Sequence, residues 1–227
     1  MAYKEFIKSL NGDGVEGELV KTLIYSLLTS AIVLGVLYFT KLKTIPEFIP
    51  KYGNYLFFIA LSYALIIPAI RQVRAYKEFS CMSGMMIGMT LGMISGFLSG
   101  FYVASTNGMF IGGFFGSTLG IIIGAWNGKC CGIMGIMEGI MAGFMGGLMG
   151  AMTAFMLFND NLKIAAVLVF IIGAVIMLGL NYMLFKESSQ LERKRKEDQF
   201  LTIALTFILT IITTWLIVFG PRSAIFS

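Results

Sequence analysis

The sequence predicts an all-α, polytopic transmembrane helical bundle of about 7 spans with a glycine-zipper three-helix core. Its 227 residues are 57% hydrophobic and 13% charged, and the mean hydropathy of +0.85 is too high for a soluble domain of this size. Seven apolar runs approach the roughly 20 residues that a helix needs to cross a bilayer. Between Cys81 and Phe158, glycine recurs every fourth residue, and such spacing allows transmembrane helices to pack closely.

The apolar runs divide the chain into segments. They lie at 22–40, 53–70, 81–103, 108–126, 131–158, 164–185 and 200–219. Pro68 near the end of the short second run predicts a kink or partial insertion. We therefore expect an N-terminal interfacial segment at 1–20, transmembrane helices 1 and 2 at 21–70, a Gly/Met-rich three-helix core at 81–158, and helices 6 and 7 at 164–219 with a charged loop at 186–199.

The glycines are expected to hold the central three helices together. In water each helical glycine costs about 1 kcal/mol relative to alanine, but in a bilayer small residues let helix backbones approach one another. The residues predicted to pack are Gly88, Gly92, Gly112, Gly116, Gly120, Gly139 and Gly143. Short turn signals at 105–108 and 127–129 predict that these helices are consecutive antiparallel neighbours.

Basic residues predict the orientation. With seven spans, five of the 17 Lys and Arg residues lie opposite the N-terminus, namely Lys41, Lys43, Lys51, Lys163 and Arg222, and the other twelve share its side. The positive-inside rule makes the N-terminus cytoplasmic, in what we expect to be a prokaryotic cytoplasmic membrane. All three cysteines begin spans on that side, where thiols stay reduced.

Sulfur side chains are concentrated in the third and fifth runs, which hold twelve of the sixteen methionines. The candidate metal ligands are Cys81, Cys130, Cys131, Met82, Met86, Met89, Met93, Met134, Met137, Met141 and Met145. Thiolate and thioether suit soft cations, and the absence of histidine removes the commonest alternative ligand. We expect Cu(I) or another soft ion, with no nucleotide and no haem. The simpler interpretation is that methionine is a flexible apolar filler.

Glu138 is a candidate for an ion or proton path. It lies about two turns inside the fifth run, where a charged carboxylate is costly unless it is paired, protonated or hydrated. The alternative is a neutral acid hydrogen-bonded to a neighbouring helix, or a carboxylate hydrated from the cytoplasm.

Three resemblances arise at these residues. The steps Met82 to Met86, Met85 to Met89 and Met89 to Met93, with GxxxG helices, resemble the signature of Ctr-type copper transporters, which have three spans. The vicinal pair Cys130-Cys131 is similar to the pair in MerT-like mercuric-ion transporters. Residues 81–158 resemble uncharacterised Met/Gly-rich bacterial integral membrane proteins, and this third resemblance implies no function.

Three functions stay open at this point. The first is transport or sequestration of a soft metal ion by cytoplasmic Cys and intramembrane Met. The others are a non-catalytic, glycine-packed structural subunit of a membrane complex and a cation or proton channel centred on Glu138. No nucleophile and base set or cofactor fingerprint predicts an enzyme. The expected partners are the lipid bilayer and either further copies or other membrane subunits, not nucleic acid.

Overall fold

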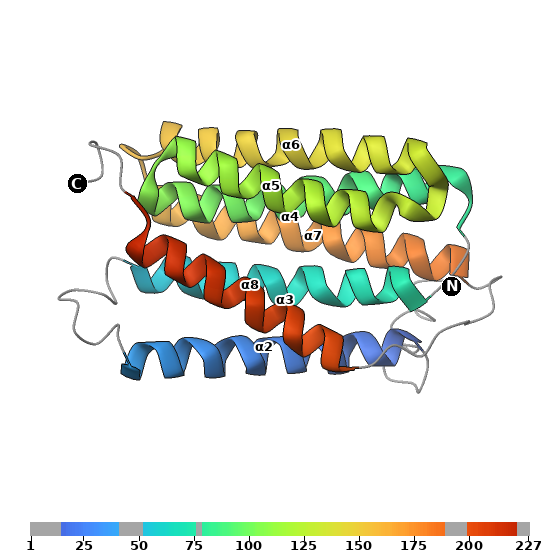
Figure 1. Cartoon of the computed structure of the whole chain (residues 1–227), viewed down its shortest axis with the longest axis horizontal. Coiled ribbons are helices and arrows are strands. Elements are labelled where there is room, and N and C mark those ends of the chain that lie inside the picture. Colours follow the sequence, from blue (N-terminus) through green and yellow to red (C-terminus); the bar gives the residue numbers. More distant parts are fainter. Residues whose placement is uncertain (1–14, 41–51, 76–78, 189–198, 222–227) are drawn as a thin grey trace.

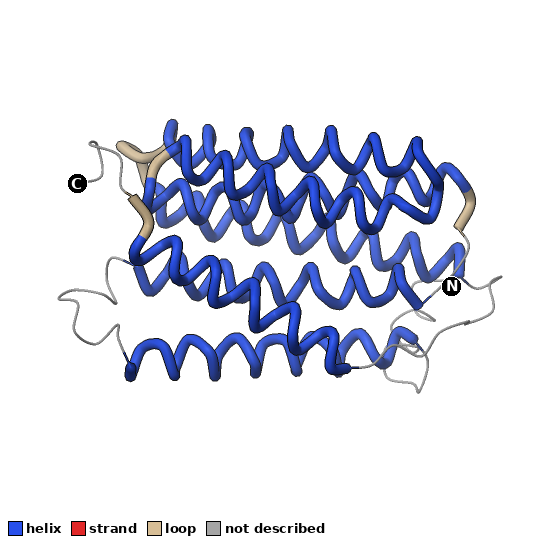
Figure 2. The backbone as a smooth tube through the Cα atoms, in the orientation of Figure 1, coloured by secondary structure: helices blue, strands red, loops and turns tan. Residues whose placement is uncertain are grey.

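The computed structural model describes residues 15–40, 52–75, 79–188 and 199–221, and within these ranges it contains helices and turns but no strand (Figure 2). The all-α fold class is therefore confirmed. The helices are α2 (Val15–Thr40), α3 (Asn54–Ala75), α4 (Cys81–Asn107), α5 (Met109–Gly128), the 3-10 turn η3 (Lys129–Cys131), α6 (Gly132–Met156), α7 (Leu162–Ser188) and α8 (Gln199–Phe219). The expected interfacial segment, up to residue 14, and loop residues 189–198 lie outside the described residues.

Six continuous helical stretches in the described part of the chain are long and apolar enough to cross a membrane. The longest, Met109–Met156, has 48 residues and folds back at η3, so it contains both α5 and α6. The architecture is that of an integral membrane protein, and six stretches with one folded back agree closely with the seven predicted spans.

The second span differs from the prediction. Helix α3 continues through Pro68 to Ala75, and Pro68 is buried inside it. A proline removes one backbone hydrogen bond and usually bends or ends a helix. Asn54–Ala75 is, however, the most deeply buried of the six spans, and neighbouring helices can compensate for the lost bond in a membrane protein. Burial thus outweighs the preference of Pro68 to end a helix, and α3 extends to Ala75, beyond the predicted run that ended at residue 70. The predicted kink stays a prediction.

Figure 1 shows α4, α5 and α6 together at one side of the bundle, α2 at the opposite side and α3 between them. The three grouped helices pack backbone against backbone. A Cβ atom built on Gly92 would lie 2.9 Å from the carbonyl oxygen of Gly139, and one built on Gly96 would lie 2.8 Å from that of Gly143. On α5, a Cβ on Gly116 would lie 2.6 Å from Cα of Gly100. A larger side chain at any of these positions would separate the helices.

The remaining predicted packing glycines also face backbone or small side chains of neighbouring helices: Gly88, Gly112, Gly120, Gly139 and Gly143. The turns between the helices depend on glycine for a different reason. Gly108 between α4 and α5 has φ +106°, and Gly132 after η3 has φ +70°. Because L side chains rarely adopt these angles, glycine sets both close approach and chain reversal in this part of the molecule.

Large side chains hold the other helices. Ile59 and Tyr63 of α3 are almost fully buried, and the ring of Phe58 stacks on Tyr102 of α4 with 6.3 Å between centroids. The Tyr102 hydroxyl donates a hydrogen bond of 3.0 Å to the carbonyl of Ala166 in α7. Helix α3 therefore packs with the side of α4 that carries Tyr102 in a conventional core of large side chains.

Helices α2 and α8 contact each other, and each carries a row of small buried hydroxyl residues that the sequence analysis did not single out. The rows are Thr22, Ser26 and Ser30 on α2 and Thr202, Thr206 and Thr210 on α8, all buried. Their spacing of four keeps each row on one helix face. Such residues are common where transmembrane helices meet.

Candidate sulfur site

The three cysteines meet at one end of the glycine-packed helices. Cys81 is the first residue of α4, directly after Ser80, whose hydroxyl caps the helix by accepting a hydrogen bond from the amide of Ser83. Cys130 and Cys131 lie in η3. The Cα atoms of Cys81 and Cys131 are 5.0 Å apart, and a disulfide joins the two residues. The fold thus brings together residues that are 50 positions apart.

Cys130 is the free thiol of the cluster and is half-buried. It donates a hydrogen bond of 3.3 Å to the carbonyl of Asn127. A Cβ atom built on Gly84, one turn into α4, would lie 3.0 Å from the Cys130 sulfur and 2.9 Å from Cβ of Cys131. Because Gly84 has no side chain, the two vicinal cysteines can pack against α4 at this position.

The structure corrects one part of the predicted site. The cysteines were expected to be reduced, whereas Cys81 and Cys131 are bonded to each other. The sequence indicated one membrane face for all three, but it could not give the distance between α4 and η3. Among the described residues, no group of three or more His, Cys, Asp or Glu side chains could hold a metal ion in this form.

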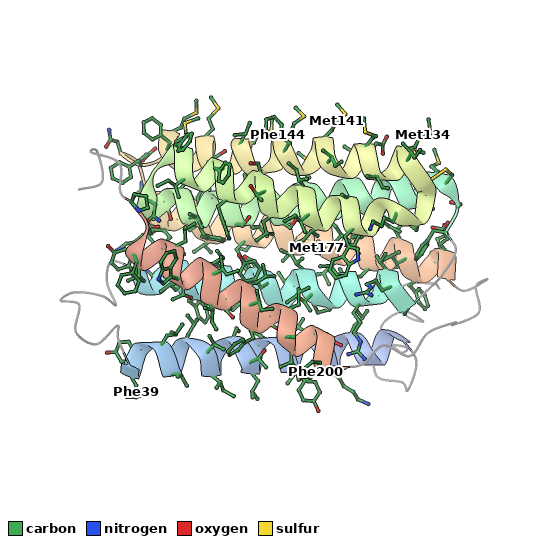
Figure 3. The ribbon with its side chains drawn as sticks, viewed as in Figure 1. Phe39, Met134, Met141, Phe144, Met177 and Phe200 are labelled. Atoms are coloured by element: carbon green, nitrogen blue, oxygen red, sulfur yellow. A yellow bond between two sulfur atoms is a disulfide. The ribbon has the colours of Figure 1, made fainter. Side chains whose placement is uncertain are left out.

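The predicted methionine ligands lie on the outside of the bundle. Met134, Met137 and Met141 of α6 are 67%, 55% and 63% exposed, and Figure 3 shows Met134 and Met141 pointing away from the other helices. Met177 of α7, by contrast, is 1% exposed. The other candidate methionines are exposed as well: Met82, Met86, Met89, Met93 and Met145.

The exposed positions of the methionines mean that a metal ion moving along them would travel on the outside of a single bundle, not through its interior. Glycines occupy the inner face of α6, so the methionines on its opposite face must point outwards. In one copy they form a surface, which we call the methionine face, defined by Met134, Met137, Met141, Met145 and Met149 of α6. Among the described residues no second helix covers it.

Glu138 is exposed on the same outer side of α6. Glu138 does not line the interior of a single bundle. The geometry of one chain therefore does not support a channel centred on this residue. A carboxylate directed at lipid is costly. Its position therefore favours water or another protein over hydrocarbon beside the start of the methionine face.

Comparisons with protein-family models, with curated proteins and with solved structures found no match to this chain. The resemblances to Ctr-type and MerT-like transporters stay predictions. Function is argued below from the geometry alone.

Proposed function

We propose that this membrane protein captures a soft metal ion, Cu(I) in the first place, at its cysteine cluster. The observation that carries the proposal is the convergence of Cys81, Cys130 and Cys131 from two separate elements at one end of the three packed helices. Three sulfur ligands suit a soft ion such as Cu(I) and do not suit Mg(II), which prefers oxygen ligands.

Capture requires the reduced form. A dithiol reductant would supply two electrons and two protons to the Cys81–Cys131 bond, releasing two thiols beside Cys130. Metal binding then displaces thiol protons, because the thiolate is the ligand. Met82 and Met134, both exposed near this end, are the nearest thioethers in sequence for onward transfer. Redox state would thus decide whether the site is open to the ion.

The test is metal binding by purified full-length protein, reduced and oxidised in parallel. The reduced protein should take about one Cu(I) or Ag(I) per chain from a colorimetric chelator, and the oxidised protein should take none. Cys130→Ser should weaken capture, whereas Met177→Leu, a change at a buried methionine, should not. Equal binding by both redox forms, or none by either, would contradict the proposal.

The orientation is also part of the proposal. The excess of basic residues supports a cytoplasmic N-terminus, which would put the cysteine cluster on the side where reductants are abundant. Reporter fusions after residues 43 and 189 should report outside and inside, respectively. If both fusions report the same side of the membrane, this topology is wrong.

A second candidate function, a structural subunit of a membrane complex, is favoured by the exposed methionine face and by Glu138 beside it. A second copy is the occupant that we would test first, because methionine adapts readily to another surface. Native mass spectrometry should find an oligomer that Met141→Trp dissociates, while Ile172→Trp on the exposed side of α7 leaves it intact. A monomeric wild-type protein would rule out self-association.

A further inference from the structure

A second candidate site, distinct from the cysteines, is a groove between α5 and α8 whose tryptophan end lies near η3. The cavity has a volume of about 440 Å³, within the range of about 300–1,000 Å³ typical of ligand pockets. Its walls and floor include Ile70 of α3, Leu119, Ile123 and Trp126 of α5, and Leu205 and Ile208 of α8. The lining is almost wholly apolar, so it suits a hydrocarbon chain.

The polar atoms in the groove do not suit a polar ligand. Among the described residues that line it, only Thr118 and Trp126 carry polar side-chain atoms. The Thr118 hydroxyl already donates a hydrogen bond of 2.7 Å to the carbonyl of Phe114 in its own helix. A sugar or a nucleotide would lose its water here without gaining partners.

Positive charge is concentrated at one end of the groove. The guanidinium carbon of Arg74 lies 4.7 Å from the centroid of the Trp126 ring. Arg74 follows Ile70 by four residues on α3, so its charge lies one helical turn beyond the cavity floor. Lys129, exposed, follows Trp126 by three residues in a continuing right-handed turn. Arg74 therefore contacts the tryptophan that closes this end, and the second cation, Lys129, follows that tryptophan at the end of α5.

We propose that the groove binds an anionic phospholipid, with one acyl chain along α5 and α8 and the phosphate headgroup at Arg74 and Lys129. The apolar lining accounts for the chain, and the two cations account for the headgroup. Trp126 lies between them, as tryptophan does where hydrocarbon meets headgroups. None of the described residues that line the cavity is a carboxylate that would oppose an anion. A zwitterionic lipid would fill the groove equally but would be held less well at its head.

The experiment uses the two tryptophans as reporters in the full-length protein. Trp215→Phe leaves Trp126 in the groove, and Trp126→Phe leaves Trp215, which is 63% exposed elsewhere on α8. Each protein is reconstituted in phosphatidylcholine vesicles with rising fractions of brominated phosphatidylglycerol or brominated phosphatidylcholine. Bromine quenches only adjacent indoles, so intensity with brominated lipid relative to unbrominated lipid measures contact.

Trp126 should be half-quenched at an about thirtyfold lower fraction of the anionic lipid, because each of the two cations contributes about 1 kcal/mol near the surface. Trp215 should show no preference. Arg74→Gln should lower the preference at Trp126 to about fivefold, the contribution of one remaining cation, whereas Lys163→Gln, at the opposite membrane side, should leave it unchanged. Ala204→Phe, which fills part of the groove, should reduce quenching of Trp126 by both lipids.

Equal quenching of Trp126 by the two lipids would overturn the proposal, as would a preference that Arg74→Gln does not diminish. If Arg74→Gln does not fold, Lys129→Gln gives the same test, and unchanged quenching of Trp215 shows that a variant is correctly inserted. These outcomes do not depend on metal binding or on oligomeric state.

Discussion

Two parts of the bundle pack in opposite ways. Helices α4, α5 and α6 meet through glycine, with backbone against backbone, as at Gly96 and Gly143. Helix α3 meets its neighbours through large buried side chains such as Ile59 and Tyr63. The first arrangement leaves no room for added atoms, and the second depends on atoms that are present. Enlargement should therefore damage the glycine-packed helices, and truncation should damage the part built around α3.

The largest effect is expected from Gly96→Leu. The new side chain would meet the backbone of Gly143 and Gly147, which cannot move without separating the helices, so we expect a loss of about 3 kcal/mol or more. Thermal unfolding in detergent measures it. Gly179→Leu is the matched control, because nothing lies within 4 Å of a Cβ atom built there. Equal stability of the two variants would contradict backbone packing.

Truncation at Ile59→Ala is expected to cost about 2 kcal/mol, the low end for a buried aliphatic residue, because lipid is nearly as apolar as the bundle and mainly packing is lost. The same unfolding measurement applies. Ile172→Ala on the exposed side of α7 should change stability little. A larger loss at Ile172 than at Ile59 would mean that α3 is not the centre of a side-chain core.

Tyr102→Phe removes the hydroxyl that donates to Ala166 but keeps the ring stacked on Phe58. We expect a loss of about 1 kcal/mol, typical of one buried hydrogen bond. Tyr25→Phe, at an exposed tyrosine, should be neutral in the same assay. If Tyr102→Phe is neutral too, the contact between α4 and α7 rests on the ring alone.

The smallest effect is expected on the outer side of the glycine-packed helices. The double exchange Met137→Leu and Met141→Leu should change stability by no more than about 0.5 kcal/mol, as at other exposed positions. Met177→Ala, inside the bundle, is the contrasting variant and should be clearly destabilised. A marked loss in the double variant would show that the methionine face is covered in the assembled protein, and would favour the subunit function.

Much of this architecture follows from local sequence. The lengths of the apolar runs, the glycine spacing of four and the turn residues at Gly108 and Gly128 each act over a few residues, so they predict the helices and their antiparallel grouping. The opposition of glycine and methionine on α6 follows from helical periodicity alone. Predicting these features requires no knowledge of long-range contacts.

Tertiary structure decided the rest. Whether the methionine side of α6 faced inwards depended on which face the glycines would occupy, and that requires α4 and α5 as partners. Cys81 and Cys131 are joined across 50 residues, and Arg74 meets Trp126 from another helix. The continuation of α3 through Pro68 likewise depends on burial by neighbouring helices. Each of these is a distance between residues remote in the chain, and sequence periodicity carries no information about such distances.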